Sequence, residues 1–218
     1  VAEVDAAIAR VPGELIDTPG LLYERLRWRR LKGRDEDARK ILFEAPKYLG
    51  NSKLWWRERA IQARKALNSG LVTDAYRLAS EHGQIDSSTF AEAEWLAGWI
   101  ALRFLGESKA AIRHFTRLYD AVFMPISRAR AAYWAGRAAE EMGDIEGATL
   151  WFTSAAQYPG AYYGQLASAR LTNSDTSLFK EEKHGVPDAS TVIIQGHEMF
   201  AVIRLLDYLG KDRLAGVF

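Results

Sequence analysis

Residues 143–152 read Gly-Asp-Ile-Glu-Gly-Ala-Thr-Leu-Trp-Phe, and the spacing of three residue types within this stretch decides the fold. A glycine is followed five residues later by an alanine, and four residues after that by an apolar residue. The glycines of the four copies lie 37, 36 and 37 residues apart. The chain therefore contains an internal repeat with a period of about 37 residues. The four copies are Gly33, Ala38, Leu42; Gly70, Ala75, Ala79; Gly106, Ala111, Phe115; and Gly143, Ala148, Phe152.

Each residue of this frame suits one position in a pair of helices. Glycine fits the tight turn between two helices, because it adopts backbone angles that other residues avoid. Alanine lets the two helices approach closely, and the apolar residue one turn later packs against the next pair. A unit of this length cannot bury its apolar face alone and must stack on its neighbours. The spacing predicts an all-α fold, a right-handed α-solenoid of antiparallel helix pairs similar to tetratricopeptide repeats.

Residues that break helices recur at regular intervals, and they delimit the expected helix pairs. No segment has the strict alternation of a half-buried strand. A single further helix over 160–171 is expected to end the array. The expected pairs are 20–32 with 34–45, 53–69 with 71–82, 88–105 with 107–121, and 126–142 with 144–157.

The sequence divides into three parts. Residues 1–171 are expected to form the superhelical repeat domain, and the polar stretch 172–189 a connector across the surface. Residues 190–218 carry the start of a further helical module, which the end of the chain interrupts. The first residues read as the interior of a helical segment, so we expect the chain to be part of a longer polypeptide.

The composition argues against several classes of protein. Lys and Arg number 29 against 28 Asp and Glu, whereas a protein that binds nucleic acid through phosphate contacts needs a clear basic excess. Binding of nucleic acid would depend on one helix alone, in which basic residues are concentrated. No apolar run is long enough for a membrane span. Because the first residues are acidic and lack an apolar segment, we expect any signal peptide to lie outside this chain. The residues of that basic helix are Arg25, Arg27, Arg29, Arg30, Lys32 and Arg34.

The sequence contains no complete set of catalytic residues. With no cysteine, thiolate chemistry is excluded. The four histidines do not have the spacing of metal ligands, and there is neither a glycine-rich phosphate loop nor a Gly-x-Ser-x-Gly motif. We therefore expect no metal, no cofactor and no catalytic residue in this chain.

Two groups of residues are candidates for ligand binding. Arg25 and Arg29 fall on the apolar arc of the first repeat helix, where they either snorkel and pair with a neighbouring helix or form a basic strip. Arg130, Trp134 and Arg137 follow one another at spacings of four and three on the helix over 126–142. Trp134 is either part of the core between repeats or a stacking platform for a sugar ring or a peptide.

Three stretches resemble the superhelical region of soluble lytic murein transglycosylases. The first, at 97–105, reads Ala-Gly-Trp-Ile-Ala-Leu-Arg-Phe-Leu, and the second, at 125–138, reads Pro-Ile-Ser-Arg-Ala-Arg-Ala-Ala-Tyr-Trp-Ala-Gly-Arg-Ala. The third, at 158–167, reads Tyr-Pro-Gly-Ala-Tyr-Tyr-Gly-Gln-Leu-Ala, and it adds Tyr162 and Tyr163 to the candidate binding residues. The resemblance covers most of residues 20–170.

The resemblance implies a periplasmic bacterial enzyme that cleaves the bond between N-acetylmuramic acid and N-acetylglucosamine and leaves a 1,6-anhydro end. Its catalytic domain would lie beyond residue 218 in the same polypeptide, and this chain would hold glycan strands or stem peptides. The one Glu-Ser pair, Glu107 and Ser108, is followed by repeat sequence rather than by the family's glycine-rich catalytic motif. We therefore expect this chain alone to be inactive. The alternative is an adaptor of the tetratricopeptide type that binds a protein partner.

Overall fold

The computed structural model describes residues 2–46, 50–85 and 88–172, together with Leu205 and Tyr208. This part of the chain is helical and contains no strand, which confirms the all-α class. Contacts group the chain into two compact units, Val1–Thr176 and Ser177–Phe218. Apart from Thr172, Leu205 and Tyr208, the expected connector and the expected further module lie outside the described residues.

The predicted helix boundaries agree with the observed ones to within about two residues, and two short helices precede them. The helices are α1 (Ala2–Ile8), α2 (Gly13–Ile16), α3 (Pro19–Leu31), α4 (Asp35–Glu44), α5 (Ser52–Asn68), α6 (Val72–Ser80), α7 (Ser88–Ile100), η1 (Ala101–Leu105), α8 (Ser108–Ala121), α9 (Pro125–Glu141), α10 (Ile145–Ala156) and α11 (Tyr162–Leu171).

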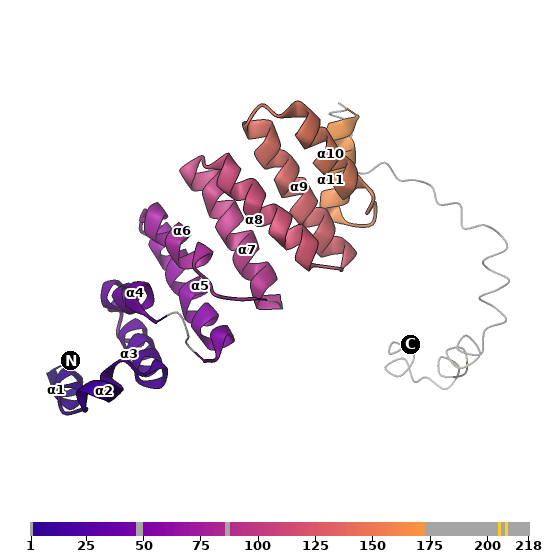
Figure 1. Cartoon of the computed structure of the whole chain (residues 1–218). Helices are drawn as coiled ribbons and strands as arrows, with labels where there is room; N and C mark the ends of the chain where they lie inside the picture. Colours follow the sequence, from indigo (N-terminus) through magenta and orange to yellow (C-terminus); the bar gives the residue numbers. More distant parts are fainter. Residues whose placement is uncertain (1, 47–49, 86–87, 173–204, 206–207, 209–218) are drawn as a thin grey trace. The chain divides into compact units, whose positions relative to one another are not determined.

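From α3 onward, each helix packs against the next one along the chain. Four helix pairs result, namely α3 with α4, α5 with α6, α7 with α8, and α9 with α10. Contacts join each pair to the next, between α4 and α5, between α6 and α7, and between α8 and α9. Figure 1 shows α11 beside α9 and α10, and it contacts both. The order of packing follows the order of the sequence, as the repeat predicts.

The four repeat glycines adopt the backbone conformation that the frame requires. Gly33, Gly70, Gly106 and Gly143 have φ angles of 70°, 75°, 68° and 74°. In this left-handed region glycine avoids the Cβ clash that penalises other residues. At three of the turns, the amide after the glycine donates to a carbonyl five residues back and closes the helix end. These bonds are Arg34 N to Arg29 O (2.9 Å), Leu71 N to Ala66 O (2.9 Å) and Asp144 N to Ala139 O (3.0 Å).

The other two positions of the frame lie in the core of every copy. All four alanines and all four apolar residues are buried, with at most 3% of their surface exposed. The sequence predicted that the apolar residue packs against the next pair, but Phe115 and Phe152 pack on Gly98 and Gly136, in the first helix of their own pair. Small residues permit this close contact, and large ones fill the space beside them. The predicted register of the repeat is therefore confirmed at all twelve positions.

One helix departs from its expected form. The helix expected over 88–105 is α-helical only to Ile100 and continues as a π-helical turn, η1. The closing hydrogen bond of this turn, Glu107 N to Ala101 O at 2.9 Å, spans six residues instead of five. The third repeat therefore accommodates one additional residue in its first helix, as π-turns do.

The last helix begins later than expected, at Tyr162 rather than at 160. Ala161 has the extended backbone of a residue that precedes a helix (φ −98°, ψ 139°). None of the helices in the described part of the chain is both long and apolar enough to cross a membrane.

Candidate functional site

Three aromatic side chains form a ladder along α7 and η1. The rings of Trp95 and Trp99 stack with centroids 5.9 Å apart, and Phe104 meets Trp99 edge-on at 5.0 Å. Side chains four residues apart share one face of an α-helix, as Trp95 and Trp99 do. Phe104 follows Trp99 by five residues, and the wider turn of η1 brings it back to that face. The π-turn therefore serves to align the ladder.

Helix α9 adds a cation to this ladder. The guanidinium carbon of Arg130 lies 5.0 Å from the ring centre of Trp95, within the range of a cation–π contact. The Arg130 Nε is buried and has no hydrogen-bond partner among the residues that the structure describes. Burial lowers the pKa of Arg130, and Tyr163 opposes this only in part. Arg130 forms no ion pair with any carboxylate of the described residues.

Trp134 lies one turn after Arg130 on the same helix and is half-buried. Its ring is 6.3 Å from Phe115 and 6.4 Å from Tyr163, so it connects α8 with α11. It packs against two of the core clusters, yet its Nε1 has no hydrogen-bond partner, and the Nε1 of Trp95 has none either. Leaving such donors without a partner is costly, and a bound ligand or water would relieve that cost.

Helix α11 contributes the tyrosines. Tyr163 is half-buried and lies 5.4 Å from Tyr133, whereas Tyr162 is 62% exposed and contacts Tyr163 edge-on. Close packing of this helix requires Gly164, because a Cβ built there would lie 2.1 Å from the Tyr158 carbonyl oxygen. We call the following set the aromatic–arginine strip: Trp95, Trp99, Phe104, Arg130, Trp134 and Tyr163.

Arg137 belongs to a different group of contacts. Its guanidinium is 3.1 Å from Glu140 and 3.9 Å from Glu141 on the same helix. Glu140 also pairs with Arg170 of α11 at 2.8 Å. The predicted trio of Arg130, Trp134 and Arg137 is therefore divided, since Arg137 is engaged in an ion-pair network that joins α9 to α11.

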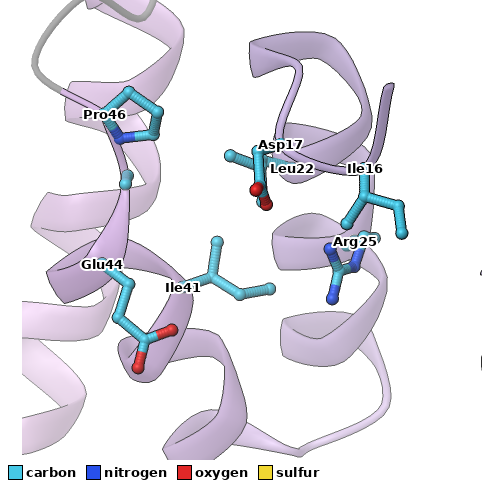
Figure 2. Close-up of a pocket in the computed structure, with 8 residues that line it drawn as sticks. Ile16, Asp17, Leu22, Arg25, Ile41, Glu44 and Pro46 are labelled. Atoms are coloured by element: carbon cyan, nitrogen blue, oxygen red, sulfur yellow. The ribbon is translucent and has the colours of Figure 1, made fainter. Parts of the chain in front are cut away.

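The two arginines predicted on the first repeat helix also differ in their surroundings. Arg25 lines a pocket of about 400 Å³ among α2, α3 and α4. Figure 2 shows Arg25 and Asp17 on one wall of this pocket, with Ile41 and Glu44 on the other. The Nε of Arg25 is buried and has no partner within the described part of the chain, whereas Arg29 donates to the Arg25 carbonyl at 3.4 Å and is not among the residues that line the pocket.

A buried polar network joins α6, α7 and α8. Glu94 is 2% exposed and accepts hydrogen bonds from His82 at 3.1 Å, His114 at 2.6 Å and Arg117 at 2.9 Å. Burial raises the pKa of Glu94, but the hydrogen bonds from His114, His82 and Arg117 outweigh it and hold the pKa below its ordinary value. The other ring nitrogen of His114 is 3.1 Å from the Tyr76 hydroxyl.

The network places a hydroxyl, an imidazole and a carboxylate in the order found in proton relays. Its burial and its hydrogen bonds nevertheless indicate a structural role. The carboxylate and both imidazoles are buried. Burial also raises the pKa of Tyr76, which favours its neutral form over a nucleophilic one. The backbone amide of Gln84 donates a hydrogen bond to His82 Nδ1 at 2.9 Å, so the ring proton of His82 is on Nε2. This Nε2–H donates a hydrogen bond to the Glu94 carboxylate. The network therefore holds three helices together.

The structure brings together Arg130, Trp134 and Tyr163, which the sequence had singled out, and adds three residues that sequence reasoning missed. The sequence does hint at these three aromatic residues, because Trp99 follows Trp95 by four residues and Phe104 follows Trp99 by five. The five-residue spacing, however, places Phe104 on the same helix face only when the helix contains a π-turn. Among the described residues, no group of three or more His, Asp or Glu side chains is arranged to hold a metal. The strip offers ring faces and hydrogen-bond donors, a chemistry suited to binding.

No family model, curated protein or solved structure matches the chain.

Proposed function

We propose that the helix pairs form a right-handed α-solenoid similar to tetratricopeptide repeats, and that it is the substrate-positioning region of a periplasmic peptidoglycan lytic transglycosylase. The solenoid is supported by the four glycine turns and by helices that pack in chain order. The family is supported by the resemblance of three stretches, at 97–105, 125–138 and 158–167, each of which carries at least one residue of the strip. The catalytic domain would follow residue 218 in the same polypeptide.

The aromatic–arginine strip is the observation that carries this proposal. Aromatic ring faces stack on the apolar faces of sugar rings, and a guanidinium pairs with carboxylates. Peptidoglycan offers both groups, because its strands of sugar rings carry acidic stem peptides as side branches. In this proposal the rings of Trp99 and Phe104 stack on sugar rings of the glycan, and Arg130 is the charged group beside them.

The test is sedimentation of the purified chain with insoluble peptidoglycan. Phe104 is 46% exposed, so its replacement by serine removes a stacking ring with little damage to the core. We expect Phe104→Ser to weaken binding by about 1–3 kcal/mol, the magnitude of one aromatic stacking contact. The control is Phe123→Ser, because Phe123 is 85% exposed and outside the strip. A wild-type chain that stays in the supernatant, or equal pelleting of all three proteins, contradicts the proposal.

A second candidate function is an adaptor that binds a protein partner. It is favoured by three exposed apolar residues, Phe123 and Met124 between α8 and α9 and Ile126 in the first turn of α9. Exposed apolar residues that cluster are typical of protein interaction sites. The adaptor predicts no sedimentation with peptidoglycan, so the same experiment separates the two functions.

A further inference from the structure

Arg130 is a half-buried arginine with no anionic partner among the described residues, a state that it shares with Arg25 and Arg128 and that separates it from the arginines in ion-pair networks. Arg30 pairs with Glu58, Arg117 with Glu94, and Arg137 with Glu140. Arg130 has only the Trp95 ring, and no carboxylate of the described residues lies within ion-pair distance. A cation that is partly removed from water without a counter-charge destabilises the fold. The Trp95 ring supplies a contact but no counter-charge, so the guanidinium is suited to an external anionic partner.

The guanidinium is placed to meet such a partner. Its Nε is buried, but its two Nη atoms are neither buried nor hydrogen-bonded within the described residues, so they remain open to a ligand. The face of Trp95 holds the guanidinium in place from one side. A planar guanidinium that is fixed in this way presents its donors to a carboxylate in a defined geometry.

We infer that Arg130 binds a carboxylate of the ligand, so that the strip selects an acidic, peptide-bearing glycan over a neutral one. The inference rests on the proposed function, because it assigns the acidic group to a stem peptide of peptidoglycan. In this arrangement the sugar rings stack on Trp99 and Phe104, and the carboxylate of the attached peptide pairs with Arg130. Arg130 is thus the residue that determines specificity.

The experiment is calorimetric titration of the full chain with two soluble probes. One probe is uncrosslinked peptidoglycan strands that carry stem peptides, and the other is chitin hexasaccharide, which has acetylated sugar rings but no carboxylate. We expect Arg130→Gln to weaken binding of the acidic strands about tenfold or more, the effect of losing a charged hydrogen bond. Its affinity for the neutral hexasaccharide should equal that of the wild type. Added salt should weaken only the wild-type complex with the acidic strands.

The matched control is Arg137→Gln, on the same helix, because Arg137 already pairs with Glu140 and Glu141. It should leave both affinities unchanged. Equal losses for both probes in Arg130→Gln, or no loss for either, would overturn the inference while leaving the proposed function intact. Equal losses in the two arginine variants would also overturn it.

Failure of the proposed function gives a different result. If the wild-type chain binds neither probe, the titration is repeated with poly-glutamate, a carboxylate polymer without sugar. Binding that depends on Arg130 then supports the carboxylate site while removing peptidoglycan as the ligand, and the absence of such binding overturns both. Thermal melts provide a readout that does not depend on any ligand. Arg130→Met should melt at or above the wild-type temperature, and a clearly lower melting temperature would show that Arg130 is a structural residue.

Discussion

The phenyl ring of Phe152 fills the space beside Gly136 in which any other residue would place its Cβ atom. A Cβ built on Gly136 would lie 2.7 Å from Cε1 of Phe152. The preceding repeat has the same contact, since a Cβ on Gly98 would lie 2.8 Å from Cε1 of Phe115. In both repeats, therefore, the large apolar residue of the second helix packs directly on the backbone of the first.

This contact predicts that Gly136→Ala destabilises the fold although alanine is the better helix former. The added methyl group overpacks the contact with Phe152, which typically costs about 1–3 kcal/mol and exceeds the gain of about 1 kcal/mol in helix propensity. Gly20→Ala in α3 is the matched control, because a Cβ there meets nothing within 4 Å. Urea unfolding should show lower stability for Gly136→Ala only, and equal stability of the two variants would refute the contact.

The buried carboxylate of Glu94 predicts a dependence of stability on pH. Its pKa in the folded protein lies below the ordinary value of 4.5. A depressed pKa means that the ionised group stabilises the fold above the unfolded pKa, and that this contribution is lost as the pH falls through the folded pKa. At pH 7, Glu94→Gln should cost about 3–5 kcal/mol, because it leaves a buried network of donors without their anion.

The measurement is urea unfolding of the wild type and of Glu94→Gln at pH 7 and again at pH 3.5. The difference in the free energy of unfolding between the two proteins should be smaller at pH 3.5. At that pH the wild type loses part of the stabilisation by ionised Glu94, which the variant lacks at both pH values. Glu146→Gln serves as control, since Glu146 is exposed and should behave as the wild type at both pH values. A difference that stays constant with pH would show that Glu94 does not act through its charge.

The chain by itself should release no 1,6-anhydro products from purified peptidoglycan. Its one Glu-Ser pair begins helix α8, where Glu107 is exposed to solvent. A general acid needs a carboxyl group that is positioned and kept protonated by its surroundings. Chromatography of the soluble products should therefore detect none, and anhydro products that disappear in Glu107→Gln would contradict this expectation.

The repeat was predictable from the sequence because local geometry determines it. A glycine with a φ angle of 74° at Gly143, a buried Ala148 and a buried Phe152 all follow from the requirements of a tight turn and close helices. The π-turn was not predictable in this way, because the additional residue before Gly106 leaves the period of the repeat almost unchanged. Only the hydrogen bond across six residues, from Glu107 to Ala101, reveals it.

The candidate site was less accessible to sequence reasoning because its contacts cross between helices. Periodicity placed Arg130 and Trp134 on one face of α9 but could not show that Trp95, 35 positions earlier in the chain, lies against Arg130. The partners of Glu94 were missed for the same reason. His82 and His114 are 12 and 20 residues away from it, and no spacing within a single helix relates them.

The central claim, that the strip binds peptidoglycan, is tested most directly by fluorine NMR of the chain labelled with 5-fluorotryptophan. The chain has seven tryptophans, and single Trp→Phe variants assign their resonances. We expect soluble peptidoglycan strands to shift the resonances of Trp95, Trp99 and Trp134. The resonances of Trp55 and Trp56, which lie outside the strip and are 3% and 2% exposed, should stay in place. Unchanged strip resonances at saturating ligand, or shifts confined to the other tryptophans, would contradict the claim.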